Sequence, residues 1–148
     1  MADSFFDAMN VVSSGLEVQK ERISTISSNI ANVDSYDPVT GKPYRRKDVI
    51  VESIPQHEGF KDILNREVGS GLTRAQVVDV KEDTNSPFRM VYNPNHPRAN
   101  AEGMVEMPNV NYIHEMANLM EATRSYEANI AVMNALKQSN NKALEIGR

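Results

Sequence analysis

The sequence of 148 residues contains no cysteine and no tryptophan, and only 6% of its residues are aromatic. The absence of cysteine excludes disulfide bonds, thiol nucleophiles and thiolate metal sites. Positive charge is also scarce, because 16 Lys and Arg face 20 Asp and Glu, for a net charge of -4. A nucleic-acid backbone requires a clustered positive surface, so we expect no nucleic-acid partner.

Long apolar runs are missing as well. The first seven residues carry two acids and no basic segment, and no apolar run of a secretory signal peptide follows them. No apolar stretch approaches the roughly 20 residues that a membrane-spanning helix needs. We therefore expect no direct membrane insertion, and any export must use a route without a cleavable signal.

The sequence offers no candidate for catalysis, metal binding or a cofactor. The histidines His57, His96 and His114 have no second ligand at helical metal spacing, and no glycine-rich phosphate loop is present. We expect no enzyme, no catalytic residue, no metal ligand and no cofactor. The short basic run 45–47 stands beside Asp48, and we interpret it as a solvated loop.

The prolines divide the chain into three segments. All seven lie between Pro38 and Pro108, so both ends are free of this helix breaker. The division predicts an α+β protein with an N-terminal helical arm (1–33), a β-rich middle domain (34–109) and a C-terminal helical arm (110–148). We expect the two arms to pair as a coiled-coil-like helical domain.

Heptad spacing supports a helix in each arm. Asp3 or Ser4 is the expected cap of the first helix, and Asn109 or Asn111 that of the second. The first seam consists of Phe5, Met9, Val12, Leu16, Ile23, Ile26, Ile30 and Val33. The second consists of Tyr112, Met116, Leu119, Thr123, Tyr126, Ile130 and Met133.

The middle segment reads as short strands and turns. Residues 48–52, 75–80 and 88–92 have strand composition, and residues 37–41 have the residue types of a turn. This pattern predicts a small β module, built as a partial barrel or as folded hairpins.

Further apolar residues lie beside both seams: Phe6, Val11, Val18, Ile113, Met120 and Val132. A stripe wider than a two-stranded seam favours more than one partner, so we expect the arms to bury fully only among copies or relatives of themselves. The predicted assembly interface is Phe5, Met9, Val12, Leu16, Ile23, Ile26, Ile30, Val33, Met116, Leu119, Tyr126, Ile130 and Met133. By pattern alone, a two-helix hairpin packed on its own β module and a coiled coil in an unrelated scaffold remain alternatives.

Several strings resemble the flagellar rod and hook family over essentially the whole chain. Residues 28–33 (SNIANV) resemble the family's close of the first helix, and residues 41–46 (GKPYRR) its entry into the middle domain. Residues 92–97 (YNPNHP) and 99–103 (ANAEG) are similar to the segment before the second arm. Residues 107–111 (MPNVN) and 121–129 (EATRSYEAN) complete the likeness, while residues 112–114 (YIH) depart from the family's pattern of smaller apolar and acidic residues.

The resemblance implies a structural subunit of the proximal rod, because longer family members carry larger middle domains. Such subunits are exported unfolded through the flagellar type III apparatus and stack into a helical drive shaft that crosses the periplasm. The implied partners are the chain itself, other rod proteins, the MS ring or export gate at the base, and the distal rod. The alternatives are another rod or hook subunit, or a coiled-coil structural protein associated with type III secretion.

Overall fold

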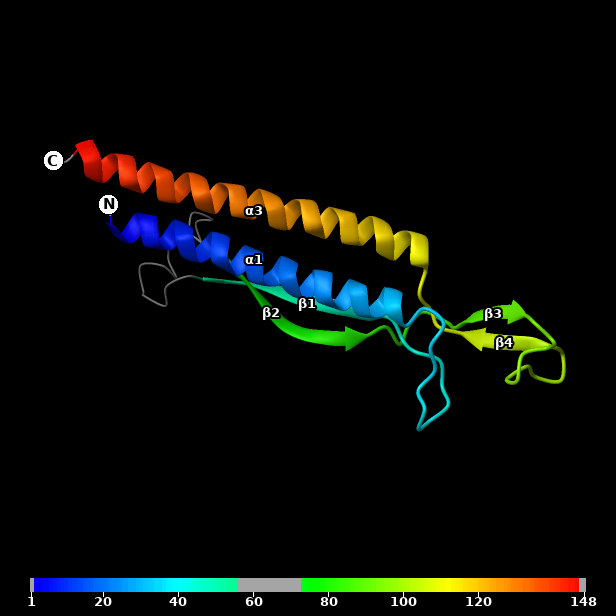
Figure 1. Cartoon of the computed structure of the whole chain (residues 1–148). Helices are drawn as coiled ribbons and strands as arrows, with labels where there is room; N and C mark the ends of the chain where they lie inside the picture. The colour runs from blue at the N-terminus through cyan, green and yellow to red at the C-terminus, as the bar shows by residue number, and fades with distance from the viewer. Residues whose placement is uncertain (1, 56–72, 147–148) are drawn as a thin grey trace.

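The computed structural model describes residues 2–55 and 73–146 as two long helices with a β region between them in sequence (Figure 1). Helix α1 spans Ala2–Ala31 and helix α3 spans Tyr112–Ile146. The helices lie side by side in opposite directions, so both chain ends are at the same end of the molecule (Figure 1). The α+β class and both helices are as the sequence predicts.

The start of α3 is fixed by Asn111. Its side-chain Oδ1 accepts hydrogen bonds from the backbone N–H groups of Ile113 at 3.1 Å and His114 at 3.3 Å, which the helix itself leaves unpaired. Asn111 is therefore the cap, rather than Asn109. The expected caps of α1 are wrong, because that helix begins at Ala2 and includes Asp3 and Ser4.

A long β ribbon runs back along α1. Strand β1 (Lys47–Pro55) pairs antiparallel with β2 (Thr73–Glu82), and the register shifts between Ile50 and Val51. The ribbon contacts α1, where the Ala75 N–H donates to the Ser14 hydroxyl at 3.3 Å. Figure 1 shows α3, α1 and the ribbon in succession, so α1 is the central layer.

A second, smaller sheet projects beyond the helices (Figure 1). Strand β3 (Arg89–Tyr92) pairs antiparallel with β4 (Met104–Met107). Gly103 precedes β4 with a φ of 75°, and a Cβ atom there would lie 2.9 Å from the Tyr92 ring, so only glycine fits. The three predicted strands are confirmed with longer or shifted ends, and β4 was not predicted. Within residues 2–55 and 73–146 the strands form two separate two-stranded antiparallel sheets, as folded hairpins would, rather than a partial barrel.

The buried side chains gather where the helices meet the β region. Among the described residues, the buried apolar ones are Val18, Ile26, Pro43, Val105, Pro108, Val110 and Ala122, and the buried polar ones are Thr25, Asn29 and Glu115. Between residues 5 and 17 of α1, and between 123 and 145 of α3, no side chain is buried. The core therefore occupies one end of the helix pair.

Candidate functional site

Asn29 ties the first helix to the beginning of the ribbon. Its side chain is fully buried. Its Nδ2 donates to the Lys47 carbonyl at 2.9 Å and to Glu115 Oε2 at 3.2 Å, while its Oδ1 accepts from the Lys47 N–H at 2.9 Å and the Tyr44 hydroxyl at 3.1 Å. The amide thus pairs with both backbone groups of Lys47 as a neighbouring strand would.

Glu115 brings the second helix to the same point. It is also fully buried, and its Oε1 accepts from Arg46 Nε at 2.7 Å. Arg46 forms a further ion pair with Asp48, and its backbone N–H donates to Asn109 Oδ1 at 2.8 Å. We call Asn29, Tyr44, Arg46 and Glu115 the polar cluster; it joins α1, the ribbon and α3.

The charges of the polar cluster favour one arrangement of α1, the ribbon and α3 over other arrangements. Burial by itself lowers the pKa of Arg46, but the hydrogen bonds and charges of Asp48 and Glu115 outweigh it and raise the pKa overall. A buried ion pair adds little net stability, because desolvation offsets the attraction, but removing one partner is costly. The cluster therefore penalises any arrangement in which the three segments do not meet.

The interpretation of residues 45–47 as a solvated loop is wrong for Arg46, whose side chain is only 20% exposed. The polar cluster was not predicted as a site, although three of its members stand in strings that carry the family resemblance. Asn29 belongs to residues 28–33, and Tyr44 and Arg46 belong to residues 41–46. A polar residue next to a seam position, as Glu115 is to Met116, was the available signal.

The helices pack in a register set by two contacts. Asn29 meets Glu115, and a Cβ added to Gly15 would lie 3.2 Å from Asn129 Nδ2. Both members of the second pair lie fourteen residues, or two heptads, from those of the first. The face that α3 turns to α1 thus passes through Glu115, the buried Ala122 and Asn129. Of the predicted seam, Tyr112, Thr123 and Ile130 are exposed, whereas Met116, Leu119, Tyr126 and Met133 are half-buried.

The thirteen predicted interface residues occupy three kinds of environment within one chain. Ile26 is buried at 7% exposure and Ile130 is exposed at 38%. The others are half-buried: Phe5, Met9, Val12, Leu16, Ile23, Ile30, Val33, Met116, Leu119, Tyr126 and Met133. Their place in contacts between subunits stays a prediction.

Helix α3 keeps a large apolar area uncovered in the single chain. Its exposed apolar side chains are Tyr112 at 51%, Ile113 at 80%, Met120 at 54%, Ile130 at 38%, Val132 at 48% and Leu144 at 64%. These side chains point to several sides of the helix, a pattern that favours burial among more than one partner. On α1, the exposed residues are mainly polar: Ser13, Glu17, Lys20, Arg22, Ser24 and Ser27.

The histidines considered in the sequence do not come together as a metal site in the described part of the chain. Among the described residues, no group of three or more His, Cys, Asp or Glu side chains is placed to hold a metal ion. His96 accepts a hydrogen bond from the Arg98 N–H at 3.2 Å, His114 is exposed, and His57 lies outside the described residues. In the described part of the chain, no helix has the length and hydropathy to cross a membrane.

Two family models match the two ends of the chain. The model described as flagella basal body rod protein matches residues 9–35. The model described as flagellar basal body rod FlgEFG protein C-terminal matches residues 101–146. The first range includes Asn29 and the second includes Glu115, so each contributes one buried member of the polar cluster.

Similar proteins match almost from end to end. The flagellar basal-body rod protein FlgC of Bacillus subtilis (strain 168) is 44% identical over 150 residues, covering 97% of this chain and 98% of the relative. FlgC of Borreliella burgdorferi is 37% identical over 150 residues, covering 95% and 96%. FlgC of Escherichia coli O6:H1 is 35% identical over 145 residues, covering 98% and 99%.

Proposed function

The chain belongs to the flagellar basal-body rod protein FlgC family and is a structural subunit of the rod, and we propose that it polymerises through its two terminal helices into a helical shaft that transmits torque across the periplasm. The proposal rests on one observation above all. Helix α3 exposes six large apolar side chains that its own chain leaves uncovered. Complete burial of a fully exposed side chain of this kind contributes about 1.5–3 kcal/mol, and covering the exposed 38–80% of each supplies part of that gain and favours packing between subunits.

The arrangement of the helices suits a shaft under torsion. We propose that the arms 1–33 and 110–148 pack among neighbouring subunits while the middle part 34–109 lies outside them. Close-packed helices have low compressibility, so aligned helices of many copies would resist twisting. A subunit that uses different surfaces for its two neighbours propagates as an open helix.

Membership of the rod family also supports proposals about the partners of the chain and its route of export. We propose contacts with the MS ring or export gate at the base, with other rod proteins, and with the distal rod above. We further propose export in an unfolded state through the flagellar type III apparatus. The relatives are rod proteins by name, and we infer that this chain catalyses no reaction.

The test places an acid at two exposed apolar positions of α3, Ile130 and Val132, which point to different sides of the helix. Ile130→Asp and Val132→Asp should abolish swimming and the recovery of basal bodies with a complete rod, because a charge cannot be buried unpaired between subunits. Circular dichroism should show the same helix content as the unchanged protein, since both positions are exposed. Gln138→Asp, which adds the same acid at an exposed polar position of α3, is the control and should swim.

Normal swimming of both Ile130→Asp and Val132→Asp would contradict the use of the exposed apolar side chains of α3 in packing between subunits. Ile26→Asp is unsuitable as an interface test, because Ile26 is buried within its own chain and the change would unfold the helix pair.

A further inference from the structure

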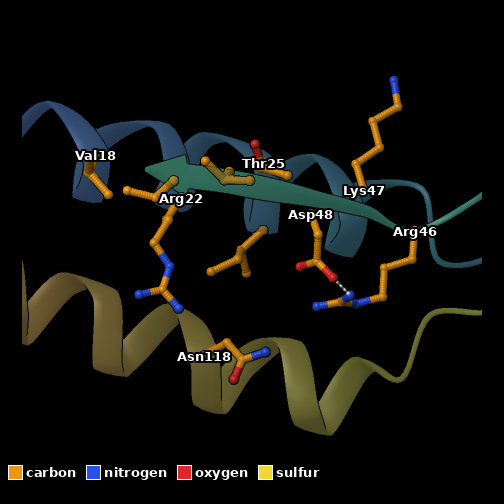
Figure 2. Close-up of a pocket in the computed structure, with 10 residues that line it drawn as sticks. Val18, Arg22, Thr25, Arg46, Lys47, Asp48 and Asn118 are labelled. Atoms are coloured by element: carbon orange, nitrogen blue, oxygen red, sulfur yellow. Dashed lines mark hydrogen bonds and ion pairs between the residues drawn. The ribbon is translucent and has the colours of Figure 1, made fainter. Parts of the chain in front are cut away.

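A groove opens beside α1 between strand β1 and helix α3. It encloses about 300 Å³, at the small end of the range for small-molecule pockets. Its apolar wall comes from Val18, Ile26, Val49 and Val51, and its polar lining from Arg22, Thr25, Arg46, Lys47, Asp48 and Asn118. Figure 2 shows α1 behind β1 with α3 along the other side, so the groove is bounded by all three elements.

The groove carries positive charge within an acidic protein. Three cations and one acid line it, whereas the whole chain has a net charge of -4. Arg46 is already paired with Asp48 and Glu115, and Lys47 points away from the groove in Figure 2. Arg22 extends from α1 toward α3 and forms no hydrogen bond or ion pair with any described residue.

The other half of a matching contact lies on α3. Ile113, Met120 and Glu127 follow one another at seven-residue intervals and are all exposed. Seven residues are about two helical turns, so the three side chains form one stripe. Glu127, like Arg22, pairs with no residue of the described chain. We call these three residues the α3 stripe.

We propose that the groove of one copy receives the α3 stripe of a second copy, with Glu127 pairing with Arg22 and Met120 against the apolar wall. This inference rests on the proposed function and names the residues of one of its contacts. The groove and the stripe combine apolar surface with one unpaired charge each, of opposite sign. A desolvated charge pair of this kind steers association and fixes register.

The geometry makes this contact a propagating one. Asn118 of α3 lines the groove. Met120 lies two residues further along, about 200° around the helix, so the α3 stripe points away from the groove. Each copy thus offers the groove on one side and the stripe on the other. Such a heterologous contact builds an open helical assembly unless its rotation closes a ring.

A charge exchange tests the pair directly. Arg22→Glu alone and Glu127→Arg alone should each reduce the number of complete rods recovered from cells by about tenfold or more. The double variant Arg22→Glu with Glu127→Arg restores the opposite charges and should recover rods to within about threefold. Lys20→Glu makes the same charge change at an exposed position of α1 outside the groove and should have little effect. Harmless single variants, or a double variant no better than the singles, would overturn the pairing.

A cross-link provides the second readout. Because the chain has no cysteine, Arg22→Cys with Glu127→Cys introduces the only two thiols. An Arg–Glu ion pair holds the two Cβ atoms farther apart than the about 3.5–4.5 Å that a disulfide needs, so a short bis-maleimide reagent, which bridges two thiols, should join neighbouring copies in isolated basal bodies. Lys20→Cys with Glu127→Cys should give no covalent dimer. If neither cross-link nor charge effect appears while Ile130→Asp still abolishes rods, this contact is wrong and the rod function stands.

Discussion

The two ends of the helix pair differ in how well their own chain covers them. At the junction end, residues 18–31 of α1 and 112–122 of α3, every buried side chain of the helices is found: Val18, Thr25, Ile26, Asn29, Glu115 and Ala122. At the terminal end, residues 5–17 and 123–145, none is buried. Yet both ends carry apolar residues at helical spacing.

The difference separates folding from assembly. The junction end is held by contacts between segments far apart in sequence, since Asn29 and Glu115 are separated by 86 positions. The terminal end has apolar surface but lacks an internal core, and a half-covered helix gains too little burial to offset its conformational entropy. We infer that the junction end folds in the single chain and that the terminal end is stabilised mainly by neighbouring subunits.

The largest effect is expected from removing the acid of the polar cluster. Glu115→Ala leaves Arg46 and Asn29 partly unpaired and should lower the free energy of unfolding by about 3 kcal/mol. Arg46 keeps Asp48, which places the loss at the lower end of the range for a broken buried pair. Urea denaturation followed by circular dichroism measures it. Glu121→Ala, at an exposed position of the same helix, should change stability by less than about 0.5 kcal/mol.

A smaller effect distinguishes apolar residues at the two ends. Ile26→Ala should cost about 2 kcal/mol, because the residue is buried but faces the groove, where part of its surroundings is open. Leu16→Ala, at a half-buried seam position of the terminal end, should cost less than about 1 kcal/mol. Equal losses in the monomer would contradict the difference between the ends.

The smallest effect concerns the approach of the helices at the terminal end. Gly15→Val places its branched side chain against Asn129, where even a Cβ comes within 3.2 Å of Nδ2. The helices must separate locally, at a cost of about 1 kcal/mol in the monomer. Gly15→Val combined with Asn129→Ala should recover most of the loss, whereas a general loss of helix propensity at position 15 would not respond to the second change.

The sequence predicts the helices well because their spacing is local. Heptad periodicity and the absence of proline locate the two long helices to within a few residues, and strand composition locates three of the four strands that the described residues form. Strand β4 (Met104–Met107) has only four residues and no distinctive alternation, so local pattern could not identify it.

Which face of α3 is buried could not be predicted in the same way. Heptad spacing placed Thr123 and Ile130 in the predicted seam. In the structure, their neighbours Ala122 and Asn129 face α1 instead. Gly15 of α1 lets the two helices approach closely beside Asn129 of α3. Which face of α3 is buried therefore depends on the partner helix rather than on the hydropathy of α3. The polar cluster likewise depends on pairings that no local window contains.

Amide hydrogen exchange on the dilute, monomeric protein tests the difference between the two ends most directly. The account predicts that amides of 25–31 and 115–122 exchange at least about 100-fold more slowly than those of 5–17 and 125–145. It also predicts that the terminal amides become protected in isolated basal bodies, where neighbouring subunits cover them. Equal protection along both helices in the monomer would contradict it, because the terminal end would then need no neighbours to fold.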